Sequence, residues 1–241
     1  STDGANYMRV NHFNKAYSVV PPREVKCFSE LLRQAGYYVT NNVKTDYQFI
    51  VPASAWAEQG VRAHWKNRPK GQPFLSIFNL NSTHESQIWK QKDSPLLVDP
   101  ERINVPPYFP DNEVVRKDMA VMYSNIARMD QQFQKLLSEL EESDEARNTI
   151  VIFYSDNGGP LPRGKREILD SGTRVPFMIR FPSGAYAGSL NNELQMFVDI
   201  PATLLSLADI DVPSYMHGKP FYGDQKKEVR SFVFGATDRF D

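Results

Sequence analysis

The chain has 241 residues, of which 41% are hydrophobic and 24% are charged. A chain of this length and composition can bury a sizeable core, which excludes a disordered or fibrous protein. Its formal net charge is −1, so it lacks the electrostatic footprint of a protein that binds duplex nucleic acid or an anionic membrane. No apolar run approaches the roughly 20 residues of a membrane-spanning helix, and the single cysteine excludes a disulfide within the chain.

The first expected helix follows a pair of prolines. Proline is tolerated in the first turn of a helix, so Pro21-Pro22 is expected to open one, and Gly36 is a typical stop after apolar residues at helical spacing. Cys27 falls inside this expected helix. No histidine lies at a spacing that would indicate a partner able to activate the thiol. A structural thiol in or beside the core is therefore favoured over a nucleophile.

The remaining pattern alternates between extended and helical segments. Apolar residues three and four apart predict one long amphipathic helix within residues 111–142, and a shorter helix is expected at 199–208. Apolar runs predict strands at 37–40, 74–80, 149–154, 175–181 and 231–235. Strands that alternate with helices, in runs too apolar to be half-exposed, predict a three-layer αβα sandwich around a mostly parallel central sheet.

The strand expected at 149–154 ends abruptly in the polar sequence S-D-N-G-G. Asp156 and Asn157 place a carboxylate and an amide oxygen side by side, and such oxygens at the end of a buried parallel strand suit Ca²⁺ or Mg²⁺. Lys165 returns a positive charge to the same loop. Asp-Asn-Gly is also common in simple turns, so a turn without a metal is the alternative on these residues alone.

This region resembles the type I, formylglycine-dependent sulfatases of the alkaline phosphatase superfamily. The resemblance rests on S-D-N-G at 155–158, G-K at 164–165 and D-S-G-T-R-V-P at 170–176. The family pattern is S-D-N/H-G, then G-K, then E-G-G-x-R-V-P, so the sequence Asp170-Ser171 departs mildly from it. The resemblance implies an alkaline phosphatase-like fold. It further implies that Asp156 and Asn157 bind one Ca²⁺, in preference to Mg²⁺, and that Lys165 contacts a sulfate oxygen.

Two more positions match the family in the expected order along the chain. Lys44 follows a helix that ends in A-G-Y and a short strand, as does the family's lysine that bridges nucleophile and sulfate. Asp46 stands where the family usually has histidine, so we keep it as an active-site neighbour in the substrate site. His84 comes shortly after the strand at 74–80, like the sulfatase histidine that faces the bridging ester oxygen. Histidine suits this position because it can donate a proton to a departing alkoxide near neutral pH.

The resemblance covers nearly the whole chain but not the family's N-terminal part. That part carries two adjacent aspartates and the motif C/S-x-P-S-R, whose cysteine or serine is oxidised to formylglycine, and we expect it upstream of Ser1. We therefore interpret residues 1–241 as one sulfatase-like catalytic domain fragment, incomplete at both ends and inactive by itself. The family implies a periplasmic, secreted or lysosomal location, while the oligomeric state is left open.

In the complete enzyme the resemblance implies hydrolysis of a sulfuric ester. Lys44 and Lys165 would neutralise sulfate oxygens, and His84 would protonate the leaving oxygen. Two alternatives remain open. One is a phosphonate or phosphodiester hydrolase of the same superfamily, and the other is a non-catalytic domain that binds sulfated glycans or serves only as a structural core.

Aromatic residues near the loops favour a carbohydrate sulfate over a small aryl sulfate as the partner. Trp56, Trp65 and Tyr47 are the residues behind this expectation. His64 beside Trp65 could line a sugar subsite, although a structural histidine that holds a loop is the favoured interpretation.

Overall fold

A computed structural model describes residues 20–45, 47 and 49–236 of the chain. The chain divides into two compact units. The first unit combines the residues up to Asn79 with 192–233, and the second combines 80–191 with the residues from Phe234 onward. Asp46, the expected active-site neighbour, lies outside the described residues.

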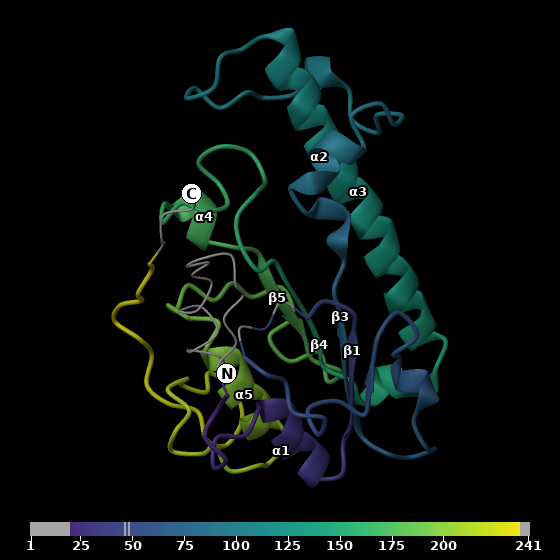
Figure 1. Cartoon of the computed structure of the whole chain (residues 1–241), viewed down its shortest axis with the longest axis vertical. Helices are drawn as coiled ribbons and strands as arrows, with labels where there is room; N and C mark the ends of the chain where they lie inside the picture. The colour runs from purple at the N-terminus through teal and green to yellow at the C-terminus, as the bar shows by residue number, and fades with distance from the viewer. Residues whose placement is uncertain (1–19, 46, 48, 237–241) are drawn as a thin grey trace. The chain divides into compact units, whose positions relative to one another are not determined.

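The first unit contains a three-stranded parallel sheet. Its strands β1 (Tyr38–Asn42), β2 (Glu58–Gln59) and β3 (Phe74–Phe78) have the order β2-β1-β3, as Figure 1 shows for β1 and β3. Tyr38 pairs with Phe74 at one end of the ladder and Asn42 with Phe78 at the other. Val39 is completely buried because β1 is the central strand. The strands expected at 37–40 and 74–80 are thus confirmed.

Helices α1 (Phe28–Gln34) and α5 (Asp199–Leu207) also belong to the first unit. They contribute Leu32 and Leu205 to a core that also contains Val39 of β1. Gly36, with φ +93°, ends α1 in the left-handed conformation that glycine adopts at little cost.

Helix α1 starts later than expected, at Phe28 instead of the proline pair. Cys27 is its N-cap, and its backbone N–H donates to the Glu30 carboxylate over 2.9 Å. The same carboxylate accepts a hydrogen bond from the Ser54 hydroxyl at 2.5 Å. These contacts fix the first turn of the helix, so the expectation that Cys27 lies within it was wrong.

Asp199 anchors the start of α5. Its carboxylate is 2% exposed and accepts hydrogen bonds from Arg230 at 2.5 and 2.9 Å and from the backbone N–H of Lys219 at 2.7 Å. Next to this ion pair, Arg230 forms an isolated bridge with Leu194. The strand expected at 231–235 is not found among the described residues, because no ladder continues beyond that bridge.

The second unit is built along α3 (Glu113–Glu141), the long helix expected from the sequence (Figure 1). The Asn112 side chain caps it by accepting the Val115 N–H at 3.0 Å. Four short helices contact α3 along its length: η2 (Asn81–Thr83), α2 (Ser86–Lys90), η3 (Pro100–Arg102) and η4 (Asp144–Asn148). Within the described ranges, none of the helices has the length and apolar character needed to cross a bilayer.

Strands β4 (Val151–Tyr154) and β5 (Phe177–Arg180) form an antiparallel pair in the second unit. The Phe153 ring of β4 lies 4.8 Å from the Phe133 ring of α3, so one face of the pair packs on the long helix. The residues of β4 are only partly buried, whereas the sequence predicted a strand buried on both faces. The reason is that β5 is its single hydrogen-bonded neighbour among the described strands.

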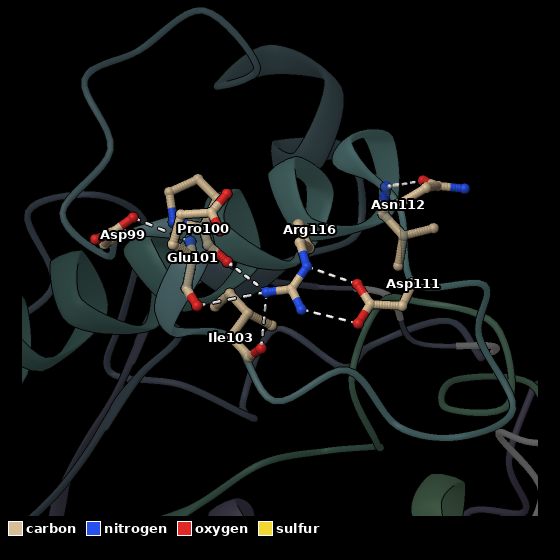
Figure 2. Close-up of polar contacts among 8 residues, drawn as sticks. Asp99, Pro100, Glu101, Ile103, Asp111, Asn112 and Arg116 are labelled. Carbon is tan, nitrogen blue, oxygen red and sulfur yellow. Dashed lines mark hydrogen bonds and ion pairs between the residues drawn. The ribbon is translucent and has the colours of Figure 1, made fainter.

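Arg116 fastens the proline-rich segment before α3 onto the helix (Figure 2). Its guanidinium forms a two-pronged contact with the Asp111 carboxylate at 2.6 and 2.8 Å. It also donates to the carbonyls of Pro100 and Ile103, both at 3.2 Å. The segment is thereby held in place, and it includes Tyr108, whose ring contacts the candidate site.

Candidate active site

Asp156 and Asn157 follow the end of β4 after one residue, Ser155, as the sequence predicted, but the strand is antiparallel to β5 and not the parallel strand expected. The Ser155 N–H donates to the Pro176 carbonyl at 3.2 Å, and the Ser155 hydroxyl donates to the Asn157 carbonyl at 2.7 Å. These bonds fix the backbone on both sides of Asp156. Burial raises the pKa of Tyr154, and the negative charge of Asp156 raises it further, so the carboxylate lies near the end of the strand.

Gly158, Gly164 and Gly172 let the loop of residues 155–173 fold tightly on itself, because a β-carbon on any of them would overlap backbone atoms. A β-carbon on Gly158 would overlap the backbone of the short helix α4 (Asp170–Thr173), and one on Gly164 would overlap the backbone of Gly159. The Lys165 N–H donates to the Gly159 carbonyl at 2.8 Å. The backbone of Lys165 therefore contacts the start of the loop that carries Asp156, as the sequence pattern indicated.

Two arginines on either side of Lys165 adopt left-handed backbone angles. The φ values are +68° for Arg163 and +77° for Arg166, and such angles cost on the order of 1–3 kcal/mol outside glycine. The Arg163 guanidinium lies 4.8 Å from the centre of the Tyr108 ring, and the Ser171 hydroxyl donates to the Arg163 carbonyl. These contacts hold the strained loop in one shape.

His84 lies immediately after η2, in a defined orientation. Its Nδ1 accepts the backbone N–H of Ser86 at 3.2 Å and lies 2.9 Å from the Ser86 hydroxyl. A backbone N–H can only donate, so Nδ1 is the acceptor and the ring proton lies on Nε2. Nε2–H is therefore the hydrogen-bond donor that the His84 ring can offer to a ligand.

Glu85 connects the His84 segment to the Lys165 loop. Its Oε1 lies 2.8 Å from the Arg166 guanidinium and 3.9 Å from the Lys165 ammonium. The Glu85 side chain is only 16% exposed, so these are sheltered contacts. Sequence reasoning missed Glu85, because no local pattern signals a contact between residues 81 positions apart.

Lys44 lies in the first unit, just past the end of β1. The buried Asn41 donates to the Lys44 carbonyl at 2.8 Å and accepts from the Asn79 amide at 3.0 Å. These bonds join the carboxyl ends of the two parallel strands β1 and β3 at the base of Lys44. That Lys44 meets His84 and Lys165 stays a prediction.

The family model described as "Sulfatase" matches residues 53–210 of the chain. The chain belongs to the sulfatase family. It is 41% identical to an ulvan-active sulfatase of Formosa agariphila, in an alignment that covers 100% of this chain and 47% of that protein. It is 32% identical to the N-sulphoglucosamine sulphohydrolase of Homo sapiens, over 51% of this chain and 24% of that protein. The chain thus spans about half the length of the first relative.

Solved structures show the fold of this sulfatase chain. One, from a Bacteroides thetaiotaomicron study of glycosaminoglycan metabolism, has a TM-score of 0.64 at 17% identity and covers 90% of this chain and 60% of its own. Another, in complex with its substrate D-glucosamine-2-N,6-O-disulfate, has a TM-score of 0.62 at 15% identity and covers 89% and 68%. The alkaline phosphatase-like α/β fold expected from the sequence is confirmed.

The loop after β4 carries two oxygen donors of the kind that a hard metal ion binds. Asp156 and Asn157 supply two hard oxygen donors, and the Asn157 amide makes no hydrogen bond within the described part of the chain. Ca²⁺ takes roughly six to eight oxygen ligands. No group of three or more His, Cys, Asp or Glu residues that could hold a metal occurs among the described residues. The donors fit Ca²⁺ in chemistry, but they would form only part of its shell.

The aromatic residues expected to line the substrate are mostly structural. Trp65 is 4% exposed and stacks on Phe74 with ring centres 6.0 Å apart. His64 lies against Trp65 and caps η1 (Trp65–Asn67) by accepting the Lys66 N–H, which is the structural role favoured from the sequence. Trp56 packs against the core of the first unit. Trp65 is thus unavailable to a substrate, because its ring is buried.

Cys27 is unsuited to nucleophilic chemistry. Burial, together with the neighbouring Glu30 carboxylate, raises the pKa of its thiol to about 11. A thiol must ionise to act as a nucleophile, so at neutral pH Cys27 stays in its unreactive form.

Proposed function

We propose that the full-length protein is a sulfuric ester hydrolase that acts on a sulfated carbohydrate. The observation that carries this proposal is the contact of Glu85 with Lys165 and Arg166, which sets a cation beside the histidine segment. The family membership supports a sulfatase, and the names of the relatives, which include ulvan-active sulfatases and an N-acetylglucosamine-6-O-sulfatase, support a glycan substrate.

In this proposal the side chains of the second unit have separate tasks. Lys165 binds a sulfate oxygen through its ammonium and offsets the negative charge that grows there during cleavage. His84 donates its Nε2 proton to the oxygen of the departing sugar. Lys44 is a second sulfate contact on the strength of the family resemblance alone.

We further propose that Asp156 and Asn157 hold Ca²⁺ together with ligands from outside the loop. When bound, the cation supplies positive charge close to the sulfate group and the attacking oxygen. The backbone packs so closely at Gly158, immediately after Asp156 and Asn157, that a β-carbon there would overlap the backbone of Ser171 and Gly172. The motif C/S-x-P-S-R does not occur in residues 1–241, so a formylglycine nucleophile would come from elsewhere in the full-length protein. A periplasmic, secreted or lysosomal location remains part of the proposal.

Release of inorganic sulfate tests the proposed function. The full-length protein, coexpressed with a formylglycine-generating enzyme, is incubated with sulfated saccharides, a phosphodiester and a phosphonate ester, and the anions are measured by ion chromatography. We expect sulfate from at least one saccharide and none from the 241-residue chain alone. Cleavage of only the phosphorus esters would favour the second hydrolase class, and saccharide binding without cleavage would favour a glycan-binding domain.

A further inference from the structure

Helix α2 carries an exposed tryptophan one turn beyond the candidate active site. Trp89 is 67% exposed, whereas Trp65 is buried and Trp56 packs against the core. An exposed indole offers an apolar face and an N–H group, both of which a partner can contact. Trp89 is separated from His84 by only five positions, so the candidate catalytic histidine and this ring lie at the two ends of one short segment.

The orientation of α2 sets Trp89 beside Glu85. The two residues are four positions apart, which places them about 40° apart around a helix and on one face. Ile88, which is 8% exposed, marks the inward side of α2, and α2 packs against α3. Glu85 reaches Lys165 and Arg166 from the same helix start. The indole is therefore on the same face of α2 as the carboxylate that contacts Lys165 and Arg166.

The charges beside Trp89 favour an anionic ligand. Lys165 and Arg166 carry two positive charges against the single negative charge of Glu85. The Arg166 side chain is 52% exposed, so it is accessible from solvent. A guanidinium is suited to planar recognition of carboxylate or sulfate groups.

We infer that Trp89 and Arg166 form a saccharide subsite next to the sulfate site, an inference that rests on the proposed function. Trp89 stacks on the apolar face of a pyranose ring, and Arg166 pairs with a carboxylate or second sulfate on that sugar. A docked protein is a poorer match, because Trp89 is followed by the exposed Lys90 and the stretch lacks the contiguous apolar patch of a protein interface.

Substrates with and without a sugar separate this role from a structural one. We compare kcat/KM of the full-length protein and its Trp89→Ala variant on a sulfated oligosaccharide and on nitrophenyl sulfate. The variant should lose about tenfold or more on the oligosaccharide, mainly through KM, as expected for a buried aromatic anchor of a complex. On nitrophenyl sulfate, which has no sugar to stack, the change should stay within about twofold. Trp89→Phe should retain most of the saccharide activity.

Tyr186→Ala is the matched control, since Tyr186 is an equally exposed aromatic of the second unit, at 65%, with its ring against Phe181. Unchanged oligosaccharide kinetics in Trp89→Ala would overturn the subsite and leave the proposed function intact. Equal losses on both substrates would also overturn it, because they would show a structural role for α2. If the wild type cleaves neither ester, the proposed function fails, and the subsite is then tested by affinity electrophoresis in a gel that contains a sulfated polysaccharide. Loss of retardation in Trp89→Ala but not in Tyr186→Ala would support the subsite. Equal retardation of the wild type and Trp89→Ala would refute it.

Discussion

Replacing Lys165 by alanine should lower kcat for a sulfate ester by about 10²- to 10³-fold, the loss seen when one preorganised charge-stabilising group is removed. Two contacts hold Lys165: its N–H donates to the Gly159 carbonyl, and its ammonium faces Glu85 at 3.9 Å. Because these contacts form without substrate, the cation needs little rearrangement to meet a sulfate. The loss of the cation also leaves the Glu85 carboxylate with less compensation, which disfavours an anionic substrate further.

The matched control is Lys135→Ala, which removes an exposed lysine from α3 in the same unit. Steady-state kinetics on nitrophenyl sulfate and on a sulfated saccharide give both values. If Lys165→Ala kept kcat within about twofold of the wild type while Lys135→Ala did the same, Lys165 would have no role in charge stabilisation.

Replacing His84 by alanine should affect sugar sulfates far more than nitrophenyl sulfate. A sugar alkoxide is a poor leaving group that needs a proton as it departs, so the loss should be about 10²- to 10⁴-fold, the usual contribution of general acid catalysis. Nitrophenolate leaves without a proton, so its rate should fall much less. The structure supports this role, because Ser86 holds Nδ1 as the acceptor and leaves the proton on Nε2.

The ratio of kcat/KM losses on the two esters is the measurement that decides the role of His84. His217→Ala, which removes an exposed histidine of the first unit, is the control and should change neither value. Equal losses on both esters in His84→Ala would contradict proton donation and leave His84 as a contact for the sulfate anion.

Elements with strong local periodicity could be predicted from the sequence. The apolar spacing within 111–142 predicted α3, which spans Glu113–Glu141. The β-branched and aromatic residues predicted β1 and β3, whose ladder joins Tyr38 to Phe74. In each case the pattern within the segment is sufficient, because burial of one face or of a whole strand leaves a regular trace in the sequence.

Features that depend on distant contacts could not be predicted. The start of α1 depends on Glu30, whose carboxylate is shared between Cys27 and Ser54. An apolar run at 231–235 suggested a strand, but a strand also needs a partner, and within the described ranges only the bridge from Arg230 to Leu194 forms. Whether a neighbouring strand is available depends on the fold and cannot be read from the sequence of residues 231–235.

In the candidate site, too, local features could be predicted from the sequence and contacts between distant segments could not. Asp156, Asn157 and Lys165 share one loop by their spacing in the sequence, and the Lys165 N–H closes that loop on the Gly159 carbonyl. The link from Glu85 to Lys165 and Arg166 joins segments far apart in the chain, and only the folded structure reveals it. The exposure of tryptophans is equally non-local, since sequence alone does not distinguish the buried Trp65 from the exposed Trp89.

A crystal structure of the full-length protein with Ca²⁺ and a bound sulfated saccharide is the most direct test of the site. We expect the sulfate group within hydrogen-bond distance of the Lys165 ammonium, with His84 Nε2 at the ester oxygen. The cation should be coordinated by oxygens of Asp156 and Asn157. A saccharide whose sulfate lies away from Lys165 and His84, or a cation bound without Asp156, would contradict the account.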